Sequence, residues 1–214
     1  MQIKICCIKN IAEANLAISH GATAVGLVSK MPSGPGVISD IEIAQIAKSL
    51  PAQIRSFLLT SRVEGSNIAE HLRITGTNTV QLVDEVKPGT YELLRKNFPD
   101  VSLVQVIHVI GESSIDYALN VAEKVDFLLL DSGNPSSPVK ELGGTGKTHN
   151  WNVSAAIVAL SPKPVFLAGG LNADNVRMAI DLVKPYGVDV CTGVRTNAIL
   201  DPQKIEELMK SIFF

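Results

Sequence analysis

Apolar runs of strand length alternate with longer amphipathic stretches along the whole chain. Eight such runs are rich in Val, Ile and Leu, and they span residues 2–7, 22–28, 53–60, 79–83, 102–109, 125–130, 164–168 and 188–192. Most of them are apolar at successive positions, so both faces of each strand are expected to be buried, as in a parallel sheet covered by helices.

The stretches between these runs have the spacing of amphipathic helices. Apolar residues recur every three or four positions across 41–50 and again across 176–183. Ser113 or Ser114 is the expected N-cap of a further helix that runs through 117–123. The chain therefore predicts strands and helices in regular alternation.

This alternation predicts a parallel α/β fold, and eight repeats in 214 residues predict a single (β/α)8 TIM barrel that spans residues 1–214 as one domain. Such barrels typically have about 250 residues, so this one would have few insertions. A doubly wound sheet is the alternative. That fold usually has a glycine-rich turn after its first strand, whereas Ile8, Lys9 and Asn10 stand there.

Composition and charge narrow the class of protein. The mean hydropathy of +0.23 is high, yet no apolar run approaches the ~20 residues of a membrane span. The net charge of −2, without blocks of like charge, is not typical of a nucleic-acid binder. Cys6, Cys7 and Cys191 fit neither zinc spacing nor a disulfide framework, and Cys191 is expected to pack against the core. Without a signal peptide at its start, the chain is expected to be reduced and cytoplasmic.

In a barrel of this kind the chemistry is expected at the carboxyl ends of the strands. Small or polar residues occupy these ends, and they are Cys6, Cys7, Asp84, His108, Asp131, Gly169, Gly170, Thr192 and Gly193. The candidate chemistry of the chain is therefore concentrated on one face of the predicted barrel.

Two glycine-containing segments follow the last two strands, where barrels often bind phosphate. Gly169 and Gly170 would let the backbone approach an anion, and free N–H groups at the start of the next helix would point toward it. Thr192 and Gly193 could add a second set of N–H donors. The alternative is that the glycines only form a tight turn and that Asn172 only caps a helix. The two segments together favour a phosphate site.

Two kinds of side chain at these ends could transfer protons. Asp131 follows the apolar run 127–130, so partial desolvation would raise its pKa and suit a general acid, although it could also anchor the turn that follows. Cys6 and Cys7 end the first strand, so alternation predicts that one faces the barrel mouth and the other faces outward. A thiolate there could act as a base or nucleophile, whereas many cysteines are simply small buried hydrophobic residues.

The segment 141–148 resembles a phosphate-binding P-loop but has Glu141 where that motif requires glycine. Its glycines, Gly144 among them, indicate a pliable loop that could close over the site. His108 and Asp84 could form an acid–base pair, but no further His, Asp or Glu spacing supports a metal. Polar lining of the pocket or structural roles are therefore favoured for both, and no metal is predicted.

Together these residues resemble the phosphoribosylanthranilate isomerase family. The matching segments run in the family's order along the whole chain, and they are Lys4-Ile-Cys6, GATAVG at 21–26, VQL at 80–82, LLLD at 128–131, GGTGKT at 143–148 with Trp151, LAGGLNADNV at 167–176 and GVDVCTGV at 187–194.

The resemblance implies a cofactor-free Amadori rearrangement in tryptophan biosynthesis, which turns an N-(5-phosphoribosyl) aminoaldose into a 1-deoxyribulose aminoketose. It implies that Cys6 is the general base that removes the C2′ proton and that Asp131 is the general acid that protonates the furanose ring oxygen. It also implies that the two glycine-containing segments bind the phosphate. The expected partner is a phosphorylated small molecule, with no nucleic acid or membrane, and the expected state is a monomer or homodimer.

The chain departs from the family pattern around the aglycone. Cys7 replaces the glycine of the usual KICG, and Val83 replaces a histidine. Gly36 stands where the family has an arginine that holds the anthranilate carboxylate, and Arg195 replaces an acid. Arg62 or Arg195 is therefore a candidate to bind that carboxylate from another direction.

Three interpretations remain at this point. The first is the isomerase of the tryptophan pathway, and the second is a related isomerase that acts on a different phosphoribosyl amine. The third is a phosphosugar-binding barrel without catalysis, against which the intact pair of Cys6 and Asp131 argues. Related histidine-pathway isomerases have carboxylates at the corresponding positions, so Cys6 favours the tryptophan branch.

Overall fold

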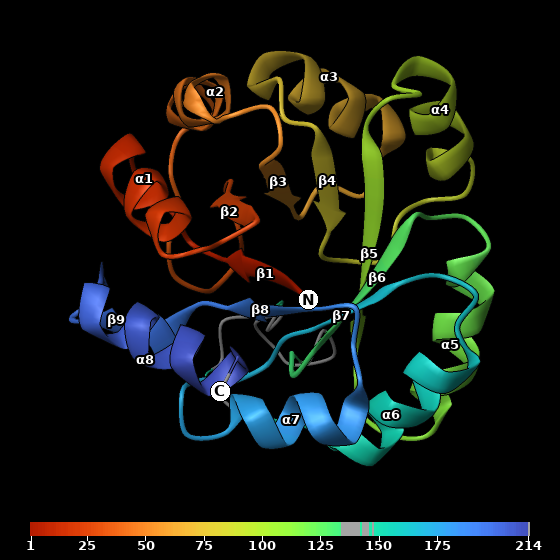
Figure 1. The fold of residues 1–214 in the computed structure, drawn as a ribbon. Coiled ribbons are helices and arrows are strands. Elements are labelled where there is room, and N and C mark those ends of the chain that lie inside the picture. Colours follow the sequence, from red (N-terminus) through yellow and green to blue (C-terminus); the bar gives the residue numbers. More distant parts are fainter. Residues whose placement is uncertain (134–141, 143–145, 147, 214) are drawn as a thin grey trace.

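The computed structural model describes residues 1–133, 142, 146 and 148–213 and shows a closed barrel of eight parallel strands inside a ring of helices (Figure 1). The strands in chain order are β1 (Gln2–Ile5), β2 (Ala24–Val28), β3 (Arg55–Thr60), β4 (Thr79–Leu82), β5 (Ser102–His108), β6 (Phe127–Asp131), β7 (Val165–Leu167) and β8 (Gly187–Val190). Because β8 pairs with β1, the sheet has no free edge, which confirms the (β/α)8 prediction over the doubly wound alternative.

One helix follows each strand. The helices are α1 (Ile11–Ser19), α2 (Asp40–Ser49), α3 (Gly65–Thr75), α4 (Thr90–Asn97), α5 (Ser113–Ala122), α6 (Trp151–Leu160), α7 (Val176–Val183) and α8 (Pro202–Phe213). Between β8 and α8 lie the short 3-10 helix η1 (Thr192–Val194) and a hairpin of β9 (Arg195–Thr196) and β10 (Ile199–Leu200). The helix α2 begins at a capping box of Ser39 and Glu42.

Two predicted helix starts are wrong. Glu112, and neither serine, is the N-cap of α5, because the Ser114 hydroxyl instead accepts the N–H of Ile110 and donates to the carbonyl of His108. In α7 the first helical residue is Val176, so Asn172 lies in a turn before the helix rather than at its cap.

The core has two layers. The larger one lies between the strands and the helices, and the smaller one fills the barrel interior from alternate positions of the strands. Inside, the ring of Phe166 meets the rings of Phe57 and Phe127 at centroid distances of 5.7 Å and the ring of Tyr186 at 5.5 Å. Gly187 is required beside them, because a Cβ there would lie 2.7 Å from the Phe166 ring. These aromatic rings fill part of the barrel interior.

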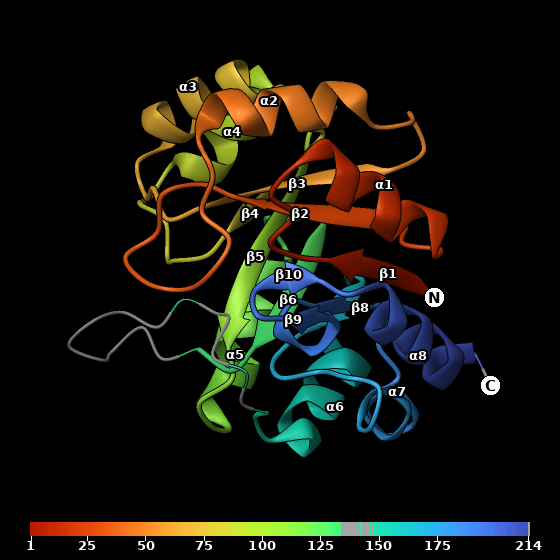
Figure 2. The same cartoon turned by 90° about the vertical axis from the view of Figure 1, so that its left-hand side faces the viewer.

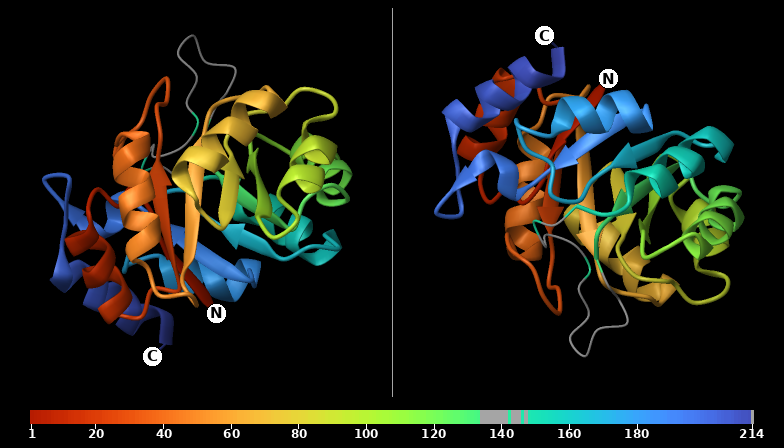
Figure 3. Two further views of the ribbon diagram at one scale, coloured as in Figure 1. Left: turned by 90° about the horizontal axis from the view of Figure 1, so that it is seen from above. Right: turned by 90° about the horizontal axis from the view of Figure 1, so that it is seen from below.

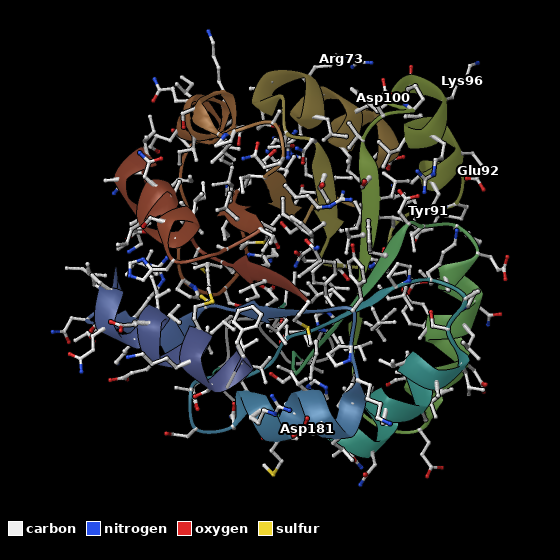
Figure 4. The ribbon with its side chains drawn as sticks, viewed as in Figure 1. Arg73, Tyr91, Glu92, Lys96, Asp100 and Asp181 are labelled. Carbon is white, nitrogen blue, oxygen red and sulfur yellow. The ribbon has the colours of Figure 1, made fainter. Side chains whose placement is uncertain are left out.

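Charged side chains cover the outer ring of helices. Arg73 of α3, Glu92 and Lys96 of α4 and Asp181 of α7 project from the outside of the ring (Figure 4). In the described part of the chain no helix is long and apolar enough to span a membrane.

The two termini lie close together at one end of the barrel (Figures 2 and 3). Because β1 starts at that end and all strands are parallel, the carboxyl ends of the strands open at the opposite end. The loops that follow the strands are therefore gathered on one face, away from both termini.

Candidate active site

A pocket opens at the carboxyl ends of the strands. Its walls come from the ends of β1, β2, β3, β4, β6, β7 and β8 and from the loops that follow several of them. Five of the predicted site residues line it, namely Cys6, Asp131, Gly169, Gly170 and Thr192. The structure thus brings together the two proton-transfer candidates and both glycine-containing segments.

Cys6 continues the line of β1 into the pocket. Its N–H donates to the carbonyl of Val190 at 2.9 Å, which keeps it paired with β8 beyond the end of the strand. Its side chain occupies room that Gly26 of β2 leaves open, because a Cβ on Gly26 would lie 2.7 Å from the Cys6 Sγ. A glycine in the middle of β2 is therefore needed to seat this thiol.

Cys7 also faces the pocket, so the prediction that one of the two cysteines faces outward is wrong. Strand alternation ends at Ile5, and Cys7 has a φ of 62°, in the left-handed region that favours glycine. Gly36 leaves space for this side chain, because a Cβ on Gly36 would lie 2.5 Å from the Cβ of Cys7. An arginine at position 36 is incompatible with Cys7, so these two departures from the family pattern are coupled.

A buried ion pair lies beneath the two cysteines. The Nζ of Lys4 in β1 lies 2.7 Å from Oδ2 of Asp189 in β8, and both side chains are buried. Burial opposes the charge on Lys4, but the Asp189 carboxylate outweighs it and raises the Lys4 pKa. The ammonium also lies 5.1 Å from the centroid of the Phe57 ring. A permanent positive charge is thereby fixed below Cys6.

Asp131 is the second carboxyl of the pocket, and its surroundings differ from those of Asp189. Burial raises the Asp131 pKa, and the Ser132 N–H at 2.7 Å from Oδ1 opposes this, but among the described residues no cation forms an ion pair with Asp131. Burial raises the Asp189 pKa as well, against the opposing effect of Lys4. Asp189, however, is in direct contact with the Lys4 ammonium, and on this contact we assign the negative charge to Asp189 and the exchangeable proton to Asp131. Asp131 also anchors the turn that follows it, so the two sequence interpretations of this residue are compatible.

The two neighbouring thiols differ in acidity. The pKa of Cys6 is lowered by a hydrogen bond from the Cys7 thiol and by the charge of Lys4, against the effects of burial and Asp189. The pKa of Cys7 is raised by its hydrogen bonds with Cys191 and Cys6 and by burial. Cys6 is therefore the thiol that can exist as a thiolate, with Cys7 as its proton-bearing donor.

The two glycine-containing segments meet backbone to backbone. Gly169 and Gly170 both have positive φ, at 85° and 65°. A Cβ on Gly193 would lie 2.1 Å from the carbonyl oxygen of Leu171, so only glycine lets the second segment pack against the first. Gly193 itself does not line the pocket, whereas Thr192 does.

The N–H groups after Gly170 belong to a turn and not to a helix start, which corrects the sequence interpretation. Oδ1 of Asn172 accepts the N–H of Asp174, and the side chain of Asn175 donates to the carbonyl of Gly170. The hydrogen bond from Asn175 fixes the backbone of Gly170, while Gly169 and Gly170 both line the pocket. Loop N–H groups are accordingly the anion donors that this segment offers.

Arg195 does not reach the pocket, so its predicted contact with a substrate carboxylate is not supported. Its Nη2 donates to the carbonyls of Cys6 at 3.2 Å and Cys7 at 2.6 Å, and its Nη1 lies 3.1 Å from Oε1 of Glu13. The side chain is buried. It therefore braces the turn that presents the two thiols, a role that the sequence did not indicate.

Arg62 lies beside the active-site pocket. Its guanidinium lies 3.6 Å from Asp40 and donates to the carbonyl of Asn67 at 2.9 Å. It lines a neighbouring hollow that shares Met31 with the pocket. The described residues that line the pocket include no arginine or lysine.

His108 and Asp84 lie behind the pocket wall rather than on it. The Nε2 of His108 is 2.9 Å from the carbonyl of Val83, so this histidine fixes the end of β4. Gly144 and most of the loop 141–148 lie outside the described residues. Among the residues that are described, no group of three or more His, Cys, Asp or Glu side chains is placed to hold a metal.

Sequence reasoning missed three residues that shape the surroundings of Cys6, namely Lys4, Asp189 and Gly26. A signal for the ion pair exists in the sequence, because a lysine and an aspartate stand alone inside two apolar strands. Barrel closure puts these two positions in register, as Lys4 and Asp189 are direct partners in the pairing of β1 with β8. Gly26 offered no local signal, since only the folded chain places it beside Cys6.

Comparisons with known proteins agree with this geometry. A family model described as N-(5'phosphoribosyl)anthranilate (PRA) isomerase matches residues 3–211. The N-(5'-phosphoribosyl)anthranilate isomerase 2 of Methanosarcina mazei is 34% identical over 207 residues, which cover 96% of this chain and 91% of the relative. The isomerase of Nostoc punctiforme is 34% identical over 217 residues, covering 99% and 98% of the two chains.

Solved structures give the same match. The isomerase from Thermotoga maritima superimposes with a TM-score of 0.82 at 31% identity, covering 99% of this chain and 98% of the other. A phosphoribosylanthranilate isomerase in complex with reduced 1-(o-carboxyphenylamino)-1-deoxyribulose 5-phosphate superimposes with a TM-score of 0.79 at 28% identity and the same coverage.

The buried ion pair generates a stability prediction. Asp189→Asn leaves the Lys4 ammonium buried without its counter-charge, so we expect the free energy of unfolding to fall by about 3–5 kcal/mol in urea titrations. The double variant Lys4→Met/Asp189→Leu removes both charges and should recover most of that loss. The matched control is the exposed pair of Arg177 and Asp181, where Asp181→Asn should cost less than about 1 kcal/mol. Equal losses at the two pairs would contradict the buried-pair interpretation.

Proposed function

Because the chain belongs to the N-(5'-phosphoribosyl)anthranilate isomerase family, we propose that it converts N-(5'-phosphoribosyl)anthranilate into the 1-deoxyribulose 5-phosphate aminoketose, with Cys6 as general base and Asp131 as general acid. One observation supports these roles above all. A single pocket holds a thiol whose pKa is lowered and a carboxyl whose pKa is raised, beside loops that suit a phosphate.

The pocket supplies a binding mode for such a substrate. The N–H groups around Gly169, Gly170 and Thr192 would hold the phosphate, which places the ribose between Cys6 and Asp131. The walls from the β2, β3 and β4 ends are mostly apolar and would take the aromatic ring; they include Val28, Met31, Pro35, Leu59 and Val83.

The first proton transfer opens the sugar ring. Protonated Asp131 gives its proton to the furanose ring oxygen, the bond from that oxygen to C1′ breaks, and the amine nitrogen supplies the electron pair that forms an iminium. The carboxylate left behind keeps the hydrogen bond from the Ser132 N–H. Burial favours the protonated acid before the step, which is why this carboxyl suits the role.

The second transfer forms the enolamine. The Cys6 thiolate takes the C2′ proton, and the electron pair of that C–H bond neutralises the iminium. In the tautomerisation that follows, the Cys6 thiol gives its proton to C1′ and the Asp131 carboxylate takes the proton of the 2′-hydroxyl, so the net proton count is unchanged and both residues return to their starting forms. The Lys4 ammonium below Cys6 favours the thiolate before the step.

The anthranilate carboxylate of the substrate still needs a positively charged partner. Position 36, where the resemblance implies an arginine, holds a glycine in this chain, and Cys7 leaves no room for a larger side chain there. Of the two candidate arginines, Arg195 is committed to the cysteine turn, and we propose Arg62 as the partner. The Arg62 side chain is 37% exposed, and its Nη2 lies 3.6 Å from Oδ2 of Asp40, which is long for an ion pair. The guanidinium could therefore turn toward the pocket, passing over Met31.

The proposal includes the setting of the enzyme. The partner is a phosphorylated small molecule, and the chain acts as a monomer or homodimer in the cytoplasm. The three free thiols, all of which line the pocket, fit a reducing compartment.

Removal of either proton-transfer group should abolish most of the activity. For Cys6→Ala and Asp131→Asn we expect kcat to fall by about 10²–10⁴-fold, measured by the loss of substrate fluorescence. Asp126→Asn, at the opposite end of β6, is the matched control and should keep wild-type turnover. Inactive wild-type protein would overturn the proposed function. Turnover that survives Cys6→Ala but not Cys7→Ala would assign the base to the other thiol.

The dependence of kcat/KM on pH should reflect the ionisation of both Cys6 and Asp131. Activity needs the Cys6 thiolate, so it rises as pH rises, and it needs protonated Asp131, so it falls again at higher pH. A lowered Cys6 pKa and a raised Asp131 pKa both increase the fraction of enzyme that holds a thiolate and a protonated carboxyl at the same time, and so raise the maximum of kcat/KM. In Asp131→Asn the amide does not titrate, so the residual activity should rise with pH and then stay level. A bell that persists in this variant would show that another group sets the alkaline limb.

Arg62→Ala should weaken substrate binding without slowing the chemistry. We expect KM to rise by roughly tenfold or more at unchanged kcat, because the lost charge-assisted bond is worth about 1.5–3 kcal/mol in both the ground and transition states. Arg177→Ala, an exposed arginine on α7, is the control and should leave KM unchanged. An unaltered KM in Arg62→Ala would remove this residue from the substrate site.

A further inference from the structure

Two cysteines that the proposed reaction does not use as base or acid touch each other in the pocket wall. The Sγ atoms of Cys7 and Cys191 are 2.7 Å apart. Cys7 comes from the turn after β1, and Cys191 comes directly after β8, 184 residues later in the chain. Both line the pocket, and Cys191 is the more exposed of the two.

The surroundings favour a bond between these two sulfur atoms over any other pair. A disulfide has an S–S length of about 2.05 Å, so the two sulfurs, now 2.7 Å apart, need to approach by less than about 1 Å. The missing side chain of Gly36 leaves Cys7 room to move, since a Cβ there would lie 3.0 Å from the Cys7 Sγ. Cys6 is adjacent to Cys7 in the chain, and a disulfide between neighbours would distort the peptide bond that joins them.

We propose that Cys7 and Cys191 form an oxidation site, a dithiol that closes reversibly to a disulfide across the seam between β1 and β8. The oxidant is a low-molecular-weight disulfide of the glutathione type.

The exchange proceeds in two balanced steps. The thiolate of Cys191 attacks the oxidant RS–SR, forms a mixed disulfide and releases RS⁻. The sulfur of Cys7 then attacks the Sγ of Cys191 as its thiol proton passes to the departing RS⁻, which forms the protein disulfide and releases the second RSH. The two thiol protons end on the two released RSH molecules, and the two electrons lost by the protein thiols reduce the RS–SR bond. Cys191 is the entry point because it is the more exposed of the pair.

Closure of this bond would alter the catalytic thiol. In the dithiol state the Cys7 thiol donates to the carbonyl of Pro35 at 3.6 Å, and its side chain is the first of the groups that lower the Cys6 pKa. The disulfide has no proton to donate, so the Cys6 pKa rises toward the value set by burial, Lys4 and Asp189, the other groups that act on it. Fewer Cys6 side chains are then thiolates at a given pH. This consequence rests on the proposed role of Cys6, whereas the disulfide itself does not.

The test uses the whole protein and oxidised glutathione. After incubation and unfolding in denaturant, the chain should show one free thiol in place of three and a mass lower by two hydrogen atoms, both reversed by dithiothreitol. Trypsin leaves Cys6 and Cys7 in one peptide, so fragmentation between them must assign the bond to Cys7. Three remaining thiols, or a bond mapped to Cys6, would overturn the proposal.

Variants separate the entry thiol from the resolving thiol. Cys7→Ser should accumulate the glutathione mixed disulfide on Cys191, because no second thiol displaces it. Cys191→Ser should stay fully reduced under the same conditions, since its remaining thiols are buried. Cys6→Ser should still form the Cys7–Cys191 bond, and its failure to do so would overturn the assignment.

The link to catalysis is measured in the Asp131→Asn background, where Cys6 alone sets the rise of activity with pH. Oxidation should move that rise to higher pH, and dithiothreitol should move it back. Coincident profiles of the oxidised and reduced forms would overturn the link. A protein that forms the disulfide but turns over no substrate in either state would overturn the proposed function and leave the oxidation site standing.

Discussion

The ion pair of Lys4 and Asp189 lies at the point where β8 closes the barrel onto β1, and much of the site depends on it. A buried charge is tolerated only beside its counter-charge, so the pair ties the register of the first strand to that of the last. It places a fixed cation below Cys6 and gives Asp189 a counter-charge that opposes the effect of burial on its pKa. In the described part of the chain Asp131 has no such ion pair, and this difference underlies the proposed roles of the two carboxyls.

Three of the positions at which the sequence analysis noted a departure, Cys7, Gly36 and Arg195, are coupled around the turn after β1. Cys7 adopts a left-handed backbone where the family has glycine, and Gly36 gives up its side chain to make room. The guanidinium of Arg195 binds both cysteine carbonyls from below and is itself held by Glu13. These contacts together support the turn that carries Cys6.

Much of the fold was predictable because it depends on local pattern. Apolar runs and helical stripes gave all eight strands and the barrel, and errors were confined to ends, as at Asn172 and Ser114, where single hydrogen bonds decide. In the site, the positions of Asp131 and the Gly169–Gly170 turn followed from their place after a strand. The orientation of Cys7 could not be predicted, because one residue with positive φ cancels strand alternation.

The sequence by itself determined the alternation of elements, and hence the barrel, together with the residue types that stand at the strand ends. Those features follow from periodicity, which each segment expresses on its own. Only the tertiary structure decided that Lys4 meets Asp189, that Gly26 seats Cys6, that Arg195 lies under the turn and that Cys7 touches Cys191. Each of these contacts joins residues far apart in the chain, and no local pattern encodes a distance across a closed barrel.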